Sequence, residues 1–243
     1  YSILKTLDLK KNNLTSIEDP VEYHIGSANQ VQTNEKTGLT FAKGLRSLLR
    51  QDPDYIFVGE IRDNETAAIA THAALTGHLV FSTLHTNTAA GALPRLIDMG
   101  VEPFLAASTV RVIVGQRLVR KICPHCRVEE KESLKKLKKQ LDIEDLDQYF
   151  DAASEEKEIA IYHGEGCTAC HGTGYSGRIG VFEVLKVDSE IRQLIRDKAD
   201  EDTLQKTACK QGMRTMLADG LDKVEQGITT IEELLRVLER GEL

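Results

Sequence analysis

Two stretches decide the fold of this 243-residue chain: Asp52–Asp63, which reads DPDYIFVGEIRD, and Thr76–Asn87, which reads TGHLVFSTLHTN. Each contains a short apolar run, YIFV in the first and LVFSTL in the second, and such runs are typical of buried strands. Strands that are apolar on both faces predict a parallel sheet covered by helices. Ligands bind such sheets beyond the carboxyl ends of the strands, so Glu60 and His85 are expected to share one site.

Strand and helix patterns alternate along the first half of the chain. Asn64 is suited to cap an alanine-rich helix and Gly77 to end it. Strands that alternate with helices of about 10 to 15 residues indicate βα units, and hence an α/β fold. The predicted elements are a helix tail at 1–7, strands at 14–17, 55–58, 79–84 and 180–187, and helices at 40–50, 65–76, 88–98 and 103–114.

Composition limits the class of protein. A mass of 27.0 kDa allows one sizeable α/β core with a smaller appendage. The formal net charge of −7 argues against a broad nucleic-acid surface, so no nucleic-acid partner is expected. No apolar run approaches the roughly 18 residues of a membrane span. The chain begins at Tyr1, inside a pattern that resembles the back half of a helix, and is therefore expected to be a fragment.

Carboxylates gather after the predicted strands. Glu60 follows the strand at 55–58, where a carboxylate is suited to hold Mg²⁺ or to orient a water for attack on a phosphoryl group. The stretch SIEDPVEY ends another strand and leaves Glu18, Asp19 and Glu22 near the same sheet edge. Clustered acids need a cation or solvent, so the alternative to a magnesium site is a solvated acidic turn.

Two histidines flank the predicted strand at 79–84. His78 precedes this strand and His85 follows it, while Ser82 and Thr83 add hydroxyls suited to contact phosphate oxygens. A lone histidine after a strand is more often structural. Two histidines in a hydroxyl-rich stretch favour a sensor of the terminal phosphate.

These three stretches resemble, in order, the Asp box, Walker B motif and His box of the bacterial type II secretion and type IV pilus assembly ATPases. QRLVRKICPHC, GRIGVFEVLKV and DGLDKVEQGITTIEELLRV are similar to the carboxyl-terminal half of that family, so the resemblance spans nearly the whole chain. It implies a homo-hexameric RecA-like ring that hydrolyses ATP with Mg²⁺. The ring is expected in the cytoplasm, at the inner face of the bacterial inner membrane, docked on a secretion or pilus platform protein.

The resemblance also implies roles for individual residues. The Walker B acid would be Glu60, the Asp-box acids Glu18, Asp19 and Glu22, and the His-box histidines His78 and His85. Glu60 and Glu22 are expected to contact the nucleotide or its Mg²⁺. The family's P-loop, G-x-x-x-x-G-K-[ST], does not occur in these 243 residues. Without that phosphate cradle, we expect the chain alone to bind ATP weakly or not at all, and not to hydrolyse it.

Four cysteines form two CxxC pairs, CPHC (Cys123 and Cys126) and CTAC (Cys167 and Cys170). This spacing lets all four thiolates reach one tetrahedral Zn²⁺, and four protein ligands leave no open position, so a structural zinc site is expected. Disulfides are the alternative, but a nucleotide-type sheet indicates a reducing cytosol. CTAC followed by His171 also matches a c-type haem attachment, which leaves CPHC unexplained.

The predicted organisation has three parts. They are a RecA-like core lacking the P-loop (1–122), a tetracysteine zinc subdomain (123–177) and a strand with a helical subdomain (178–243). In the last part, Thr230 and Glu233 have the spacing of a capping box. Cys209, alone in an amphipathic helix, is expected in the core.

Lysines give the cysteine subdomain a basic helix. They are expected to lie on a solvated helix face paired with the acids at 142–158. The alternative is that they face anionic lipid headgroups or the platform protein, which would give peripheral membrane association. The lysines concerned are Lys131, Lys135, Lys136, Lys138 and Lys139.

More than one function remains open. The favoured hypothesis is an ATP-driven motor, serving secretion or pilus extension, because retraction members of the family typically lack the tetracysteine insert. The second is a non-enzymatic zinc-binding interaction module that kept the fold and lost the nucleotide. A third is a related conjugation or archaeal-type secretion ATPase, which usually lacks the cysteine pairs. Candidates to complete a neighbouring subunit's site are Arg46, Arg62, Arg95 and Arg111.

Overall fold

The computed structural model describes residues 1–141 and 158–239, and its contacts divide the chain into two compact units. The first unit comprises Tyr1–Thr86, Ala90–Ile113 and Lys186–Thr207. The second comprises Asn87–Ala89, Val114–Leu185 and Ala208–Leu243. All four cysteines of the CxxC pairs lie in the second unit, whereas residues from 178 onward contribute to both units.

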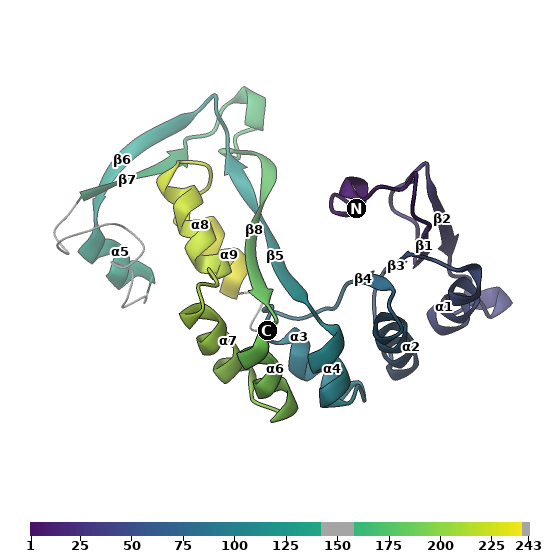
Figure 1. Cartoon of the computed structure of the whole chain (residues 1–243). Helices are drawn as coiled ribbons and strands as arrows, with labels where there is room; N and C mark the ends of the chain where they lie inside the picture. The colour runs from purple at the N-terminus through teal and green to yellow at the C-terminus, as the bar shows by residue number, and fades with distance from the viewer. Residues whose placement is uncertain (142–157, 240–243) are drawn as a thin grey trace. The chain divides into compact units, whose positions relative to one another are not determined.

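A parallel sheet forms the centre of the first unit (Figure 1). Its strands run in the order β2-β1-β3-β4, and Tyr55 of β3 pairs with Leu14 of β1 on one side and Leu79 of β4 on the other. The predicted α/β class and parallel sheet are therefore confirmed. The strands are β1 (Leu14–Glu18), β2 (Ala28–Gln32), β3 (Tyr55–Val58) and β4 (Leu79–Ser82).

Strand β2 was not predicted. Its sequence, ANQVQ, contains three side-chain amides and a single β-branched residue, Val31, so it lacks the apolar signal of a strand. It lies at the edge of the sheet and pairs with β1 along its whole length, from Ala28 to Gln32. Backbone pairing forms this strand more than burial of its side chains.

Two helices pack together on the sheet, α1 (Phe41–Leu48) and α2 (Asn64–Leu75) (Figure 1). Helix α1 approaches β1 closely, because a Cβ added at Gly44 would lie 2.6 Å from Cδ1 of Ile17. The sequence assigned the cap of α2 to Asn64, and this was wrong by one residue. The carboxylate of Asp63 caps the helix instead, accepting a hydrogen bond from the backbone N–H of Thr66 at 2.8 Å.

The helix predicted at 103–114 is too long. Helix α4 ends at Thr109, and strand β5 begins at Val112, because the β-branched residues of VRVIV favour a strand. The predicted helix tail at 1–7 is only a 3₁₀ turn, η1, at Leu4–Thr6. The other helical elements of the first unit are η2 (Glu35–Thr37), η3 (Leu49–Gln51), α3 (Ala92–Asp98), α4 (Pro103–Thr109), α6 (Ser189–Arg196) and most of α7 (Glu201–Lys210).

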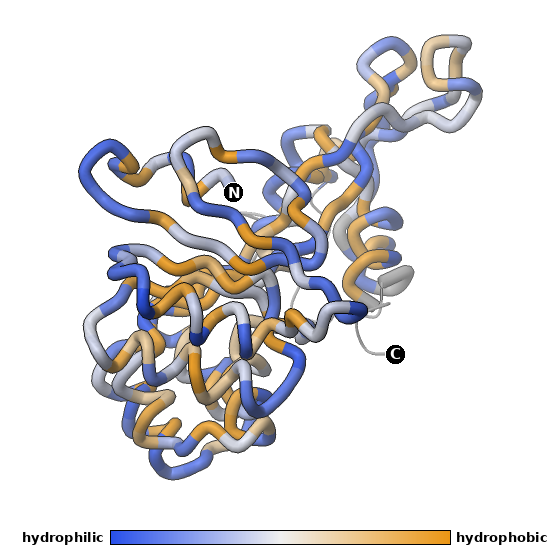
Figure 2. The backbone as a smooth tube through the Cα atoms, turned by 90° about the vertical axis from the view of Figure 1, so that its right-hand side faces the viewer, coloured by the Kyte–Doolittle hydropathy of each residue, from blue (hydrophilic) through white to orange (hydrophobic). Residues whose placement is uncertain are grey.

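Two strand pairs and three helices build the described part of the second unit. Strand β5 (Val112–Ile122) pairs with β8 (Tyr175–Lys186), and β6 (Arg127–Ser133) pairs antiparallel with β7 (Glu158–Gly164). The helices are α5 (Leu134–Leu141), α8 (Met216–Glu225) and α9 (Ile231–Glu239), and a 3₁₀ turn, η5, covers Thr168–Cys170. Hydrophobic segments (orange) alternate with hydrophilic ones (blue) along the chain in Figure 2. The apolar core of this unit includes Val119, Val181, Met216, Val224 and Leu234.

Helix α5 is the predicted lysine-rich helix. Lys135 and Lys136 are exposed, and the ammonium of Lys136 pairs with Glu132 at 2.6 Å. The acids at 142–157 lie outside the described residues, so their pairing with these lysines stays a prediction. Within residues 1–141 and 158–239, every helix is too short or too polar to cross a bilayer.

A buried carboxylate ties β5 to α9 in the second unit. The hydroxyl of Thr230 accepts a hydrogen bond from the backbone N–H of Glu233, as the predicted capping box requires. The carboxylate of Glu233 does not return to the cap but accepts from Arg120 and Arg236, at 2.7 and 2.6 Å. Burial alone would raise the pKa of Glu233, but the hydrogen bonds from Arg236 and Arg120 hold it at about 2.

We expect Glu233→Gln to lower the free energy of unfolding at pH 7 by about 3 kcal/mol, because it removes the anion from two arginines. The wild-type carboxylate stabilises the fold above its unfolded pKa of about 4.3, and this contribution is lost as pH falls toward the folded value. The variant should therefore lose less stability than the wild type between pH 5 and pH 2. Urea unfolding at several pH values measures both effects.

The exposed neighbour Glu232 supplies a matched control. Glu232→Gln should change the free energy of unfolding by no more than about 0.5 kcal/mol. If Glu233→Gln proved as stable as the wild type at pH 7, this account of the ion network would be wrong.

Candidate functional site

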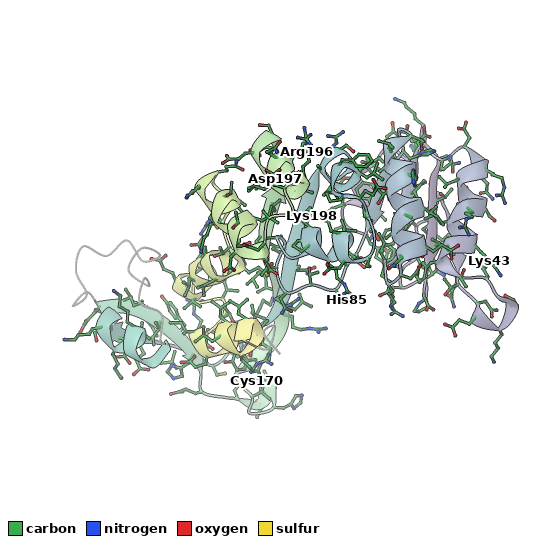
Figure 3. All side chains as sticks on the ribbon, turned by 90° about the horizontal axis from the view of Figure 1, so that it is seen from below. Lys43, His85, Cys170, Arg196, Asp197 and Lys198 are labelled. Atoms are coloured by element: carbon green, nitrogen blue, oxygen red, sulfur yellow. The ribbon has the colours of Figure 1, made fainter. Side chains whose placement is uncertain are left out.

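Glu60 and His85 lie in contact at the carboxyl edge of the parallel sheet. The Nε2 atom of His85 is 3.1 Å from Oε2 of Glu60, and the same oxygen pairs with Nε of Arg62 at 2.6 Å. The Glu60 side chain is only 11% exposed, while the side chains of Arg62 and His85 are 62% and 83% exposed. A nearly buried carboxylate is therefore covered by two solvent-facing cationic or hydrogen-bonding groups (His85 is labelled in Figure 3).

Backbone pairing that continues past the strands brings these groups together. The N–H of Gly59 donates to the carbonyl of Ile17 at 2.8 Å, and the N–H of Ile61 donates to the carbonyl of Thr83 at 3.0 Å. The hydroxyl of Thr83 donates back to the carbonyl of Gly59 at 2.6 Å. Glu60 is thus held between the end of β1 and the segment that follows β4.

Glu18, the last residue of β1, is buried at this edge with 2% of its surface exposed. Its carboxylate accepts hydrogen bonds from the hydroxyls of Tyr1 and Ser16 and from the side-chain amide of Gln30. A Cβ added at Gly59 would lie 3.2 Å from Cα of Glu18, so the chain next to Glu60 runs directly beside Glu18. Two of the predicted acids therefore lie at neighbouring strand ends.

The other predicted site residues are placed differently. Asp19 and Glu22 are exposed in the segment that follows β1. His78 precedes β4, at the opposite end of that strand from His85, and its Nδ1 lies 2.9 Å from the carbonyl oxygen of Ala73. The structure brings Glu18, Glu60 and His85 to one edge and leaves His78 at the other.

The sequence did not predict some of the residues around the two carboxylates. It predicted Arg62 only as a candidate to complete the site of a neighbouring subunit, yet Arg62 pairs with Glu60 of its own chain. Its position two residues after a strand-end acid could have indicated this ion pair. Tyr1 and Gln30 hold Glu18 as well, but Tyr1 lies in the predicted helix tail and Gln30 in a stretch without a strand pattern, so neither was predicted at this site.

The donor set at this edge suits a hard cation. Carboxylate oxygens are the ligands that Mg²⁺ takes from proteins, usually one or two of them beside water and phosphate oxygens. Glu60 and Glu18 supply such oxygens at adjacent strand ends, and Arg62 and His85 can contact an anion there. The edge therefore combines groups that fit a magnesium phosphate.

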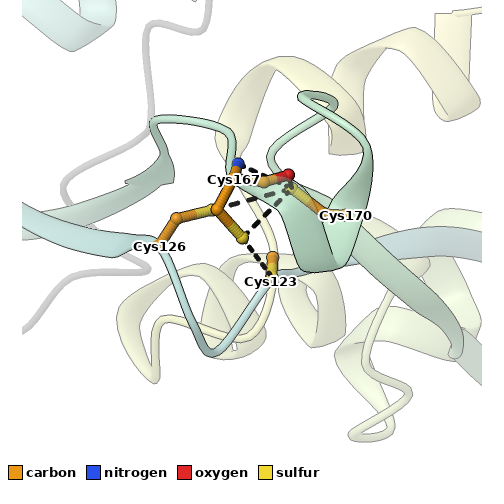
Figure 4. Close-up of side chains that lie close together, drawn as sticks. All are labelled: Cys123, Cys126, Cys167 and Cys170. Atoms are coloured by element: carbon orange, nitrogen blue, oxygen red, sulfur yellow. Dashed lines mark hydrogen bonds between the residues drawn. The ribbon is translucent and has the colours of Figure 1, made fainter.

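The four cysteines form a compact cluster in the second unit (Figure 4). Their sulfur atoms all lie within 4.8 Å of one another. Three of the separations are close to the edge of a tetrahedron with Zn–S bonds of about 2.3 Å, which is about 3.8 Å. They are 3.9 Å for Cys123–Cys167, 3.8 Å for Cys126–Cys170 and 3.8 Å for Cys167–Cys170. The donor set and its geometry fit zinc.

Backbone groups support the thiolates. The N–H groups of Cys167 and Gly174 lie 3.2 and 3.3 Å from Sγ of Cys170, and hydrogen bonding from Cys167 and Gly174 lowers the pKa of Cys170 to about 6. Burial raises the pKa of Cys126 to about 12. Glycine is required in this fold, because a Cβ at Gly164 would lie 2.2 Å from the carbonyl oxygen of Gly174. The fifth cysteine, Cys209, is exposed, so its predicted place in the core was wrong.

Comparison with known proteins identifies the family. The family model described as "Type II/IV secretion system protein" matches residues 1–236. The chain is 50% identical over 235 residues to the type IV pilus assembly ATPase PilB of Thermus thermophilus, covering 97% of this chain and 25% of PilB. It is 46% identical over 237 residues to the type II secretion system ATPase E of Vibrio cholerae, covering 98% and 45%. The chain thus spans less than half the length of these relatives.

Solved structures agree with this assignment. The crystal structure of the pilus retraction motor PilT with bound ADP has a TM-score of 0.63 at 30% identity, covering 93% of this chain and 52% of PilT. The Legionella pneumophila ATPase DotB has a TM-score of 0.62 at 25% identity, covering 96% and 54%. The resemblance inferred from the strand-end motifs is confirmed, and the chain belongs to the family of type II/IV secretion system proteins.

Proposed function

We propose that this chain works within a longer polypeptide as the carboxyl-terminal part of an ATP-hydrolysing motor for type II secretion or type IV pilus assembly. Its relatives with those names are at least twice as long, and the G-x-x-x-x-G-K-[ST] motif does not occur in its 243 residues. The missing phosphate cradle would come from the rest of the polypeptide.

The contact of Glu60 with His85, beside the buried Glu18, is the observation that supports this proposal most directly. When bound, Mg²⁺ would offset the negative charge of the triphosphate oxygens. Glu60 would hold that ion, directly or through water, because its carboxylate lies at the strand end and its position is fixed by two neighbouring segments. Hydrolysis then needs an attacking water and a group that responds to loss of the phosphate.

Glu18 and His85 fit those two needs. Glu18 is fixed by three hydrogen bonds, so its carboxylate is suited to orient a water and accept its proton. His85 is largely exposed and is suited to hydrogen-bond the terminal phosphate and return to Glu60 after its release. Roles for Asp19, Glu22 and His78 stay predictions, with Glu22 the one expected near the nucleotide.

The assembly and its partners follow from the family. We propose a homo-hexamer at the cytoplasmic face of the bacterial inner membrane, docked on a platform protein, with no nucleic-acid partner. The higher identity to PilB, named for pilus assembly, than to PilT, named for retraction, supports extension or secretion over retraction.

The longer polypeptide that contains these residues is the material for the main test. Glu60→Gln should lower its steady-state ATPase rate about 100-fold or more, because a neutral amide cannot supply the charge beside the metal. Glu65→Gln is the control: its side chain is 58% exposed and its ion pair within the described residues is with Arg46 on the surface, so activity should persist. A wild-type polypeptide without ATPase activity, or an active Glu60→Gln variant, would contradict the motor and favour a zinc-binding interaction module.

The isolated 243-residue chain should show no steady-state ATPase activity and weak or undetectable ATP binding, because the backbone amides and lysine of a P-loop are not among its residues. Calorimetry with ATP and a phosphate-release assay measure both. Turnover by this chain alone would show that another group cradles the phosphates.

The cysteine cluster is proposed to hold a structural Zn²⁺. Chain purified under reducing conditions should contain about one Zn²⁺, and Cys123→Ser or Cys170→Ser should lose the metal and lower the melting temperature, since each removes a ligand. Metal analysis and thermal unfolding measure these effects. Cys209→Ser should keep full zinc content, because Cys209 lies outside the cluster. Unchanged zinc in the Cys123→Ser protein would exclude this ligand set.

A further inference from the structure

Strand β2 of the first unit carries an amide side chain at three of its five positions. The segment 19–27 leads from β1 to β2 and contains two of the predicted acids, Asp19 and Glu22. An amide group can donate and accept hydrogen bonds at the same time, so it is suited to hold an irregular segment against a strand. One of the three amides, that of Gln30, holds this segment and Glu18 together.

The side-chain amide of Gln30 makes three hydrogen bonds. Its Nε2 atom donates to Oε1 of Glu18 at 3.0 Å and to the carbonyl oxygen of Tyr23 at 3.0 Å. Its Oε1 atom accepts from the backbone N–H of Ile25 at 2.7 Å. One side chain thus joins the carboxylate at the end of β1 to two points of the segment that follows it.

The backbone partners fix the orientation of this amide. A backbone N–H can only donate and a carbonyl oxygen can only accept, so the Gln30 oxygen must face Ile25 and its NH₂ group must face Tyr23. The second N–H of that group is then directed at the carboxylate of Glu18. The path of segment 19–27 therefore decides that Glu18 meets a donor here.

The register of the two strands places Gln30 within reach of this acid. Ser16 of β1 pairs with Gln30, and side chains two residues apart in a strand lie on the same face, so Gln30 and Glu18 share one face of the sheet. Glu18 is 2% exposed, and a buried carboxylate is costly without donors. Loss of the Gln30 amide would leave Oε1 of Glu18 with the hydroxyl of Ser16.

We propose that Gln30 is a positioning residue for the acid at the end of β1: its amide sets the direction of the Glu18 carboxylate and holds the segment 19–27, with Glu22, against β2. This rests on the proposed function, in which Glu18 orients the attacking water. In this role Gln30 acts through Glu18 and the main chain and takes no part in the reaction itself.

Amide exchange of the 243-residue chain, followed by NMR without nucleotide, tests the hold on the segment. Gln30→Leu keeps the approximate volume of the side chain but removes all three hydrogen bonds, so exchange at the N–H of Ile25 should rise about 10-fold or more. Asn29→Leu is the matched control, since it removes the neighbouring amide of β2, whose hydrogen bond goes to Asn13 at 3.2 Å. Unchanged exchange at Ile25 in Gln30→Leu, or an equal rise in both variants, would overturn the proposal.

Kinetics on the longer polypeptide test the effect on Glu18. Gln30→Glu keeps an acceptor for the N–H of Ile25 but places a carboxylate oxygen where a donor faces Glu18. Both this variant and Gln30→Leu should lower kcat about ten-fold or more while the KM for ATP changes less than about two-fold, because the acid is misdirected and the phosphate cradle comes from other residues. Asn29→Asp adds the same charge to β2 and should keep the wild-type kcat.

The two measurements fail in different ways. An unchanged kcat in either Gln30 variant, or a rise in KM alone, would overturn the proposed role of Gln30 in positioning Glu18. A wild-type polypeptide without ATPase activity would refute the proposed function, while the exchange rate at Ile25 would still decide whether Gln30 holds segment 19–27.

Discussion

The parallel register of β1, β3 and β4 is the constraint on which the candidate site depends. Ile17 pairs with Val58, and Val58 pairs with Ser82, so the three strands end within one residue of the same level. A shift by one residue in any strand would turn its side chains to the other face of the sheet. Glu18 and Glu60 lie at neighbouring strand ends, and the imidazole of His85 contacts Glu60, because the strands end together; hydrogen bonds of Gly59 with Ile17 and Thr83 keep that arrangement.

Much of this edge was predictable, because the signals are local. Apolar runs located β3 and β4, the stretch SIEDPVEY indicated the end of β1, and parallel strands in one sheet carry their following residues to one edge. The same rule explains which site residues could not be predicted. His78 precedes its strand and therefore lies at the far end, while Tyr1 and Gln30 reach Glu18 from segments in which nothing predicts such a contact. Asp63 and Asn64 are both good caps, so only the backbone geometry selected Asp63.

The second unit shows the same division between local and distant determinants. The spacing of the two CxxC pairs was enough to predict the four ligands, and the structure brings all four sulfurs together. Strict alternation in GVFEVLKV places Glu183 on the buried face with Val181 and Leu185, but nothing in that pattern reveals which donors satisfy a carboxylate there. Those donors come from residues 89 and 216, far away in the chain, and a single sequence contains no signal for such pairings.

The two acids of the candidate site differ in how firmly they are held, and this difference suits a site whose groups exchange partners. Glu18 is buried and accepts from three side chains, so withdrawing it would leave an uncompensated charge, at a cost of several kcal/mol. The partners of Glu60 are mostly exposed, and ion pairs to exposed groups contribute little, because water replaces either partner readily. Under the proposed function, an incoming phosphate would therefore take Arg62 and His85 from Glu60 at little cost while Glu18 stays in place. One fixed carboxylate beside one with exchangeable partners is the arrangement expected where a phosphate is bound, cleaved and released in turn.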